Sequence, residues 1–105
     1  MTIYRKLLIR LKRKYPQYSI RVCRRHLKDN LYGSTTHIAK NQFTIIINSK
    51  LDENDACHTL THEFAHVAAW DEFVIHNQEH GPIWGIEHSR CYQVFEELIT
   101  ELNTQ

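Results

Sequence analysis

The sequence predicts an α+β domain that contains an N-terminal helix, a small three-stranded sheet and two further helices. Three patterns support this class: apolar residues at helical spacing near the N-terminus, strict alternation over residues 18–23, and a capped helical pattern after residue 51. A chain of 105 residues has room for one hydrophobic core. We therefore expect a single domain over residues 1–105.

The first helix is predicted to end before Pro16, which cannot continue a helix. Its apolar face consists of Tyr4, Leu7, Leu8, Leu11 and Tyr15. Lys and Arg fill most of the other positions, so the apolar face should be core.

Three strands are predicted between residues 18 and 47. Residues 18–23 have the period of a strand with one buried face, and residues 34–39 are β-branched and half polar. Lys40 and Asn41 separate this polar strand from the more apolar run 43–47. We expect the three strands to form one sheet.

The second helix is predicted to run from its N-cap Asp52 to about Trp70, with Glu53 and Asp55 in the first turn, where the helix dipole favours carboxylates. The face expected to pack consists of Ala56, Leu60, Phe64 and Val67. The opposite face carries His58, His62 and His66.

The third helix is predicted to start at Pro82, with Gly81 as its cap. Its expected buried residues are Trp84, Cys91, Val94, Phe95, Leu98 and Leu102. The intervening segment 71–79 is expected to be a loop. Its apolar run Phe73-Val74-Ile75 could form a lid or a substrate-binding wall, but ordinary packing is the default expectation.

Composition argues against membrane and secreted classes. The longest aliphatic run is Ile45–Ile47, far below the roughly 18 residues of a membrane span, and basic residues interrupt every N-terminal apolar stretch. Cys23, Cys57 and Cys91 show no C-x-x-C spacing, so neither a disulfide framework nor a cysteine zinc site is indicated. We expect reduced thiols, no membrane association and a cytoplasmic location.

The net charge of +1 conceals an uneven distribution: residues 1–50 carry a charge of +11 and residues 51–105 a charge of −10. Either the halves pack with opposite charges interleaved, or a basic face contacts nucleic acid. The second interpretation predicts weak, sequence-independent DNA binding that falls steeply with salt. The basic residues concerned are Arg10, Lys12, Arg13, Lys14, Arg21, Arg24, Arg25 and Lys28.

Residues 62–66 read His-Glu-Phe-Ala-His, an H-E-x-x-H motif within the second predicted helix. Four residues advance a helix by about 400°, so His62 and His66 project from the same face and can bind one ion, with Glu63 beside it. Catalytic zinc sites use three protein ligands and leave the fourth position to water. The motif therefore predicts a zincin-like site with a third ligand elsewhere.

Candidates for the third ligand are His58, His76, Glu79, His80, Glu87 and His88. His58 is excluded, because eight residues separate it from His66, a helical rise of about 12 Å. His80 has the best position, since it follows a loop long enough to reverse direction and immediately precedes the third helix.

Three stretches together resemble the SprT-like (Spartan-type) metallopeptidases: Ile45–Asn48, Thr61–His66 and His80–Trp84, the last similar to that family's H-G-x-x-[FW] segment. The resemblance covers about residues 42–90. It implies one zinc ion per chain, held by His62, His66 and His80, with Glu63 as catalytic acid and base. Residues 91–105 lack the four-cysteine zinc ribbon that many relatives carry, so the likeness is to the catalytic domain alone.

These observations predict a zinc-dependent endopeptidase in which Glu63 is the general base that activates water. His76, His88 and Tyr92 are all within sequence reach as donors to the developing oxyanion, and nothing selects among them. A protein or peptide substrate would lie extended along strand 34–39 if that strand is a sheet edge.

Two alternatives belong to other classes: a metal-stabilised binding module that does not cleave, and a nucleic-acid-binding protein with a structural histidine site. Glu63 argues against both, because a structural site requires no carboxylate between its ligands.

Overall fold

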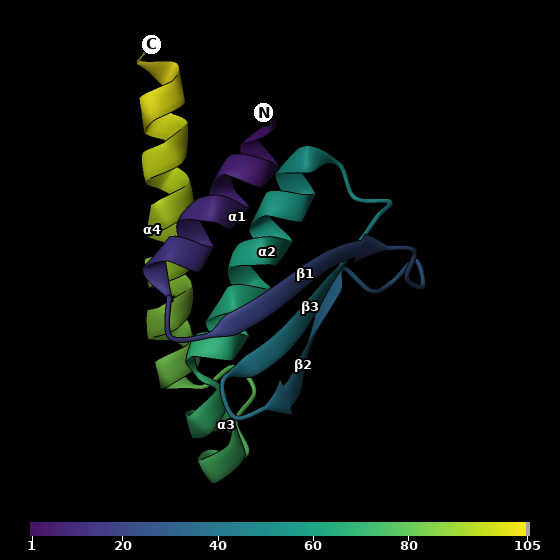
Figure 1. Ribbon diagram of the computed structural model, residues 1–105, viewed down its shortest axis with the longest axis vertical. Coiled ribbons are helices and arrows are strands. Elements are labelled where there is room, and N and C mark those ends of the chain that lie inside the picture. The colour runs from purple at the N-terminus through teal and green to yellow at the C-terminus, as the bar shows by residue number, and fades with distance from the viewer. Residues whose placement is uncertain (105) are drawn as a thin grey trace.

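The computed structural model describes residues 1–104 and confirms the α+β class, with four helices and one three-stranded sheet (Figure 1). The elements are α1 (Ile3–Lys14), β1 (Ser19–Arg25), β2 (Gly33–Ala39), β3 (Gln42–Asn48), α2 (Glu53–Ala68), α3 (Trp70–His76) and α4 (Pro82–Asn103). No helix in this part of the chain has the length and apolar character needed to cross a bilayer.

The sheet has the order β1-β3-β2, with β3 parallel to β1 and antiparallel to β2. The most apolar strand lies in the centre and buries Phe43, Ile45 and Ile47 on one face. The polar strand β2 is an edge strand, as its composition suggested. Within residues 1–104, one long side of β2 therefore has no strand partner.

Helix α2 lies between the sheet and helices α1 and α4 (Figure 1). The Asp52 side chain caps it by accepting a hydrogen bond from the Asp55 amide at 2.8 Å. The face predicted to pack is fully buried. The helix ends at Ala68, two residues before the predicted end at Trp70, because the chain turns there into α3.

Helices α1 and α4 complete the core on the side of α2 that faces away from the sheet. Leu7, Leu8 and Leu11 of α1 and the C-cap residue Tyr15 are buried, as predicted, whereas Tyr4 is only half-buried. Helix α4 buries Cys91, Phe95 and Leu98, whereas Trp84, Val94 and Leu102 are only half-buried. Trp84 is partly open because the first turn of α4 borders the histidine cluster described below.

Segment 71–79 is not wholly a loop, as the sequence suggested, because its first part belongs to α3. The prediction that the apolar run Phe73-Val74-Ile75 packs in the core is also wrong for two of its residues, because Val74 and Ile75 are 64% and 70% exposed. Only Phe73 packs, with its ring 5.2 Å from that of Trp70. Consecutive helical residues point about 100° apart, so a short helix at the end of the molecule cannot bury three in a row.

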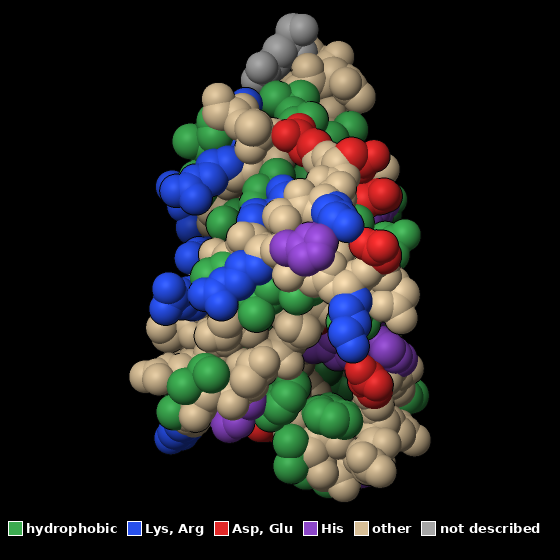
Figure 2. Space-filling model, turned by 90° about the vertical axis from the view of Figure 1, so that its right-hand side faces the viewer, with side chains coloured by type: hydrophobic (Ala, Val, Ile, Leu, Met, Phe, Trp, Pro, Cys, Tyr) green, Lys and Arg blue, Asp and Glu red, His purple; other side chains and the backbone are tan. Residues whose placement is uncertain are grey.

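The opposite charges of the two halves are mostly not paired with each other. In residues 1–104, Arg10–Glu101 is the one Lys or Arg ion pair that joins the basic half to the acidic half. Figure 2 shows most Lys and Arg side chains along the left of the face in view and most acidic side chains along the right, where some Lys or Arg side chains lie beside them. Interleaved ion pairing therefore does not account for the charge asymmetry.

Candidate metal centre

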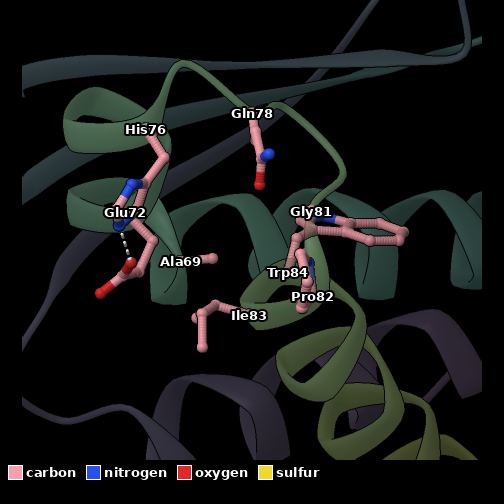
Figure 3. A pocket seen from close by; sticks show the side chains of 8 residues that line it. All are labelled: Ala69, Glu72, His76, Gln78, Gly81, Pro82, Ile83 and Trp84. Atoms are coloured by element: carbon pink, nitrogen blue, oxygen red, sulfur yellow. Dashed lines mark ion pairs between the residues drawn. The ribbon is translucent and has the colours of Figure 1, made fainter.

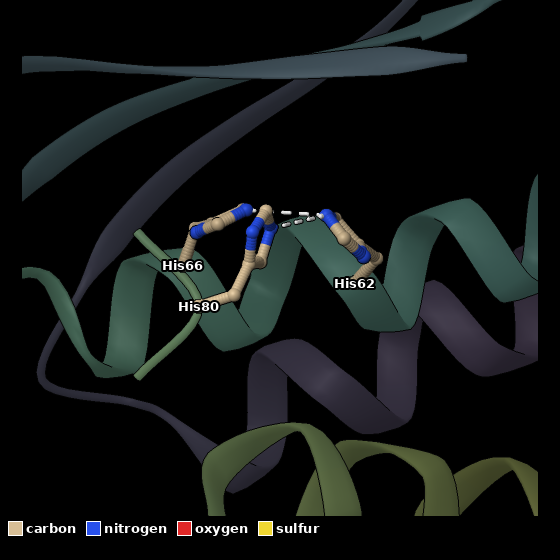
Figure 4. Close-up of side chains that lie close together, drawn as sticks. All are labelled: His62, His66 and His80. Carbon is tan, nitrogen blue, oxygen red and sulfur yellow. Dashed lines mark hydrogen bonds between the residues drawn. The ribbon is translucent and has the colours of Figure 1, made fainter. Parts of the chain in front are cut away.

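His62 and His66 are half-buried and lie one turn apart on the same face of α2, as the four-residue spacing predicts (Figure 4). Their Nε2 atoms are 3.2 Å apart, and the ring centroids are separated by 4.8 Å. The opposite face of the same helix is held in the core by Leu60 and Phe64, which are fully buried. Helix packing thus fixes the direction in which both imidazoles point.

His80 reaches these two residues from the segment that links α3 to α4 (Figure 4). Its Nε2 atom lies 3.3 Å from Nε2 of His62, and its ring centroid lies 4.9 Å from that of His66. One ring nitrogen from each of the three histidines lies within 4.8 Å of the other two. The three side chains could therefore hold a single metal ion.

The other candidates for a third ligand lie outside this cluster of three in the described residues. His76 pairs with Glu72 at 3.1 Å, and Glu87 pairs with Arg90 at 2.7 Å. His58 stacks on Tyr92. The structure thus brings together the three histidines that the sequence favoured.

Trp84 supports all three rings from the first turn of α4. Its ring centroid lies 4.9 Å from His62, 5.6 Å from His66 and 4.7 Å from His80. The His88 ring also stacks on Trp84, with ring centroids 4.7 Å apart and an interplanar angle of 7°. The sequence predicted Trp84 only as a core residue, although its place four residues after His80 in the same motif was a signal of this role.

Glu63 lies beside the histidines, and only 5% of its surface is exposed. Its Oε1 accepts a hydrogen bond from Oγ1 of Thr35 on the edge strand β2, at 3.0 Å. A hollow of about 390 Å³ opens over Glu63, His62 and His66, and is bounded by β2 and Trp70. Sequence reasoning did not identify Thr35, because its contact with Glu63 spans 28 residues and leaves no local pattern.

Burial shifts the titration of these groups. It raises the pKa of the Glu63 carboxyl to about 7, and Glu79 acts in the same direction, although the hydrogen bond from Thr35 opposes the shift. Burial also lowers the pKa of His66 to about 4 and lowers the pKa of His62. Repulsion between positive charges on neighbouring imidazoles acts in the same direction. His62 and His66 are therefore neutral near pH 7, the state in which imidazole binds a metal.

A separate hollow of about 320 Å³ lies between α3 and the start of α4 (Figure 3). Ala69, Pro82, Ile83 and Trp84 contribute its apolar part, and the paired side chains of Glu72 and His76 also line it. None of the three clustered histidines lines it. This hollow therefore does not give access to the candidate metal centre.

The fold and the cluster together define a class: an α+β protein with three histidines that could hold a metal ion and a buried carboxylate beside them. The model of the SprT-like family matches residues 4–104. The chain belongs to the SprT-like family, and the match covers nearly its whole length. Searches of curated proteins and of solved structures found no match.

Proposed function

We propose that this protein is a zinc-dependent endopeptidase. The observation that carries the proposal is the meeting of three imidazole nitrogens beside one buried carboxylate. Tetrahedral zinc with Zn–N distances of about 2.0–2.1 Å requires ligand nitrogens about 3.3–3.4 Å apart. The Nε2 separations of 3.2 Å between His62 and His66 and 3.3 Å between His62 and His80 fit that requirement.

In this proposal His62, His66 and His80 hold one zinc ion per chain, and Glu63 is the general base. A bound zinc ion would polarise a peptide carbonyl and lower the pKa of water to about 7. Glu63 takes the proton from the attacking water and later delivers it to the leaving amine. Thr35 keeps the Glu63 carboxylate in position through its hydrogen bond to Oε1.

The substrate in this proposal is a protein or peptide segment in extended conformation. Strand β2 is an edge strand, and its residues Gly33 and Thr35 border the hollow over Glu63. An extended peptide can pair with the free side of such a strand through main-chain hydrogen bonds. Its scissile bond would then lie close to Glu63.

The decisive experiment compares the parent with Glu63→Gln. This substitution keeps the size of the side chain but removes the base, so zinc should stay at one per chain while hydrolysis of an unfolded protein falls by at least about 100-fold. A non-cleaving binding module would show no zinc-dependent hydrolysis in either form. Equal hydrolysis by both forms would show that Glu63 is not the base.

A second proposal concerns partners: we infer that the basic residues bind nucleic acid weakly and without sequence preference. The observation that favours it is that one ion pair alone joins the basic half to acidic groups of the second half in residues 1–104, which leaves the positive surface largely uncompensated. Phosphate contacts of this kind act mainly through counterion release.

A further inference from the structure

A second cavity meets the candidate metal centre from the other direction along α2. It has a volume of about 530 Å³, and it shares Gly33, His62 and Glu63 with the hollow of about 390 Å³ over Glu63. The hollow continues toward His66 and Trp70, whereas this cavity continues toward His58. Glu63 therefore lies between two cavities, which are arranged as the two sides of a scissile bond would require.

Aromatic and imidazole rings form much of the wall of this second cavity. His58 of α2 stacks on Tyr92 of α4, with centroids 5.7 Å apart and an interplanar angle of 26°. Across from them, the loop before β2 contributes Leu31 and Tyr32, which are 47% and 56% exposed. Glu63 is the one carboxylate that lines the cavity in the described chain, and no Lys or Arg does so there.

Asn48 does not line the cavity, but its hydrogen bonds hold Leu31 and Tyr32 in place. The side chain is 2% exposed, and its Nδ2 donates to the carbonyl oxygen of Leu31 at 2.8 Å. Its backbone amide donates to the carbonyl oxygen of Tyr32 at 2.8 Å. The Leu31–Tyr32 wall is thus anchored to the end of β3 and forms a preorganised surface.

The size and chemistry of the cavity indicate its ligand. Its volume lies within the range of about 300–1,000 Å³ that is typical of small-molecule pockets, so it can receive the largest side chains. Aromatic rings bind other rings through offset stacking and edge-to-face contacts. A basic side chain would find only Glu63 as a partner there, and the proposed reaction already uses Glu63. An acidic side chain would find no Lys or Arg among the described lining residues.

The direction of β2 decides on which side of the scissile bond this residue lies. The cavity borders the N-terminal end of β2, and the hollow borders residues 33–35 further along the strand. Antiparallel pairing is the more stable arrangement, and it would place the C-terminal half of a peptide at the N-terminal end of β2. The residue after the scissile bond would therefore face the cavity.

We propose that this cavity selects substrates with a large aromatic side chain, Phe, Tyr or Trp, immediately after the scissile bond. The inference rests on the proposed peptidase function. The specificity-determining residues are Tyr92, His58 and Leu31.

The test combines cleavage and binding. The zinc-loaded parent is incubated with a random peptide library, and the new N-termini are identified by mass spectrometry. Aromatic residues should be enriched at least about 3-fold at the first position after the cut, given the strength of ring–ring contacts. Tyr92→Ala and Leu31→Glu should abolish this enrichment, whereas Phe73→Ala, which alters only the other hollow, should leave it unchanged. Leu31 is exposed, so its substitution does not disturb the core.

Binding is measured separately on zinc-loaded Glu63→Gln, with labelled peptides that carry either one Trp or Ala at the same position. The Trp peptide should bind about 3- to 10-fold more tightly, and Tyr92→Ala should remove the difference. Cleavage with no aromatic enrichment, or with enrichment before the cut, would overturn the inference and leave the peptidase proposal standing. Aromatic-selective binding without cleavage by the parent would support the pocket and overturn the peptidase proposal.

Discussion

Oγ1 of Thr35 donates a hydrogen bond to Oε1 of Glu63 across 3.0 Å, and so joins the edge strand β2 to the helix that carries the candidate metal ligands. Thr35 also lies 3.3 Å from the Glu63 carbonyl oxygen. The proposed base is thereby held at the point where a peptide paired with β2 would pass. The position of Glu63 depends on sheet and helix together.

Thr35→Val should lower hydrolysis while zinc content stays constant. The substitution keeps the shape of the side chain but removes a hydrogen bond that favours the ionised Glu63, so the pKa of that carboxyl should rise. We expect activity at pH 7 to fall about 3- to 10-fold, because a change of this size matches the net free energy of one hydrogen bond. The loss should shrink at higher pH, where the carboxyl ionises again. Thr36→Val, on the exposed side of β2, is the control, and equal losses in the two variants would contradict the assigned role.

His80→Ala should remove most of the bound zinc. His62 and His66 alone leave an incomplete ligand set, so affinity should fall by more than the roughly 10- to 100-fold that changes around a metal site typically cost. Metal content is measured after dialysis by mass spectrometry. His76→Ala is the matched control, because His76 pairs with Glu72 instead. Full zinc retention in the His80 variant would show that the third ligand lies elsewhere.

Gly33→Ala should destabilise the protein, because β2 approaches α2 too closely to admit a side chain. A Cβ atom at Gly33 would lie 2.8 Å from Cγ2 of Thr59 and 2.9 Å from the carbonyl oxygen of Ile46. We expect a loss of about 1–3 kcal/mol in the free energy of unfolding, measured in urea. At Gly85 of α4 a Cβ would meet no atom of another described residue within 4 Å. Gly85→Ala should therefore stabilise the helix by roughly 0.5–1 kcal/mol, and similar effects at both positions would contradict the close approach.

The metal-free protein should become more stable on Glu63→Gln at pH 8 but not at pH 4.5. Burial raises the pKa of Glu63 from 4.5 to about 7 in the folded state, so the folded state binds the extra proton between these values. The parent therefore loses stability as pH rises through this window, by up to about 3 kcal/mol. The neutral glutamine side chain of the variant carries no such penalty. Urea unfolding in a chelator at both pH values measures the difference, and a gap independent of pH would refute the raised pKa.

Single- and double-stranded DNA should bind weakly and with similar affinity, and the affinity should fall at least about 10-fold between 50 and 200 mM salt. The reason is that the basic side chains would neutralise phosphates without reading bases. Fluorescence polarisation of labelled DNA measures this. The double variant Arg24→Glu/Arg25→Glu should bind DNA more weakly than the parent at the same salt concentration. Arg90→Glu, in the acidic half, is the control and should bind like the parent. Absence of binding at 50 mM salt would remove nucleic acid as a partner.

Short sequence patterns alone predicted several features of this protein. Helical periodicity predicted the buried face of α1 and the projection of His62 and His66 from one side of α2. The capping signal at Asp52 predicted where α2 begins. Alternation and β-branched composition predicted three strands, and polarity indicated that β2 could be an edge. These features depend on residues within one or two turns of each other, so a short pattern carries them.

Tertiary structure alone decided how those pieces meet. The order β1-β3-β2 brings Gly33 over α2 and places Thr35 against Glu63. The contacts of Trp84 with the three imidazoles, and the exposure of Val74 and Ile75, likewise follow from packing between distant segments. Such contacts depend on how all the apolar surfaces of the chain pack into one small core. Hydrophobic periodicity reports only local structure, so it does not predict these contacts.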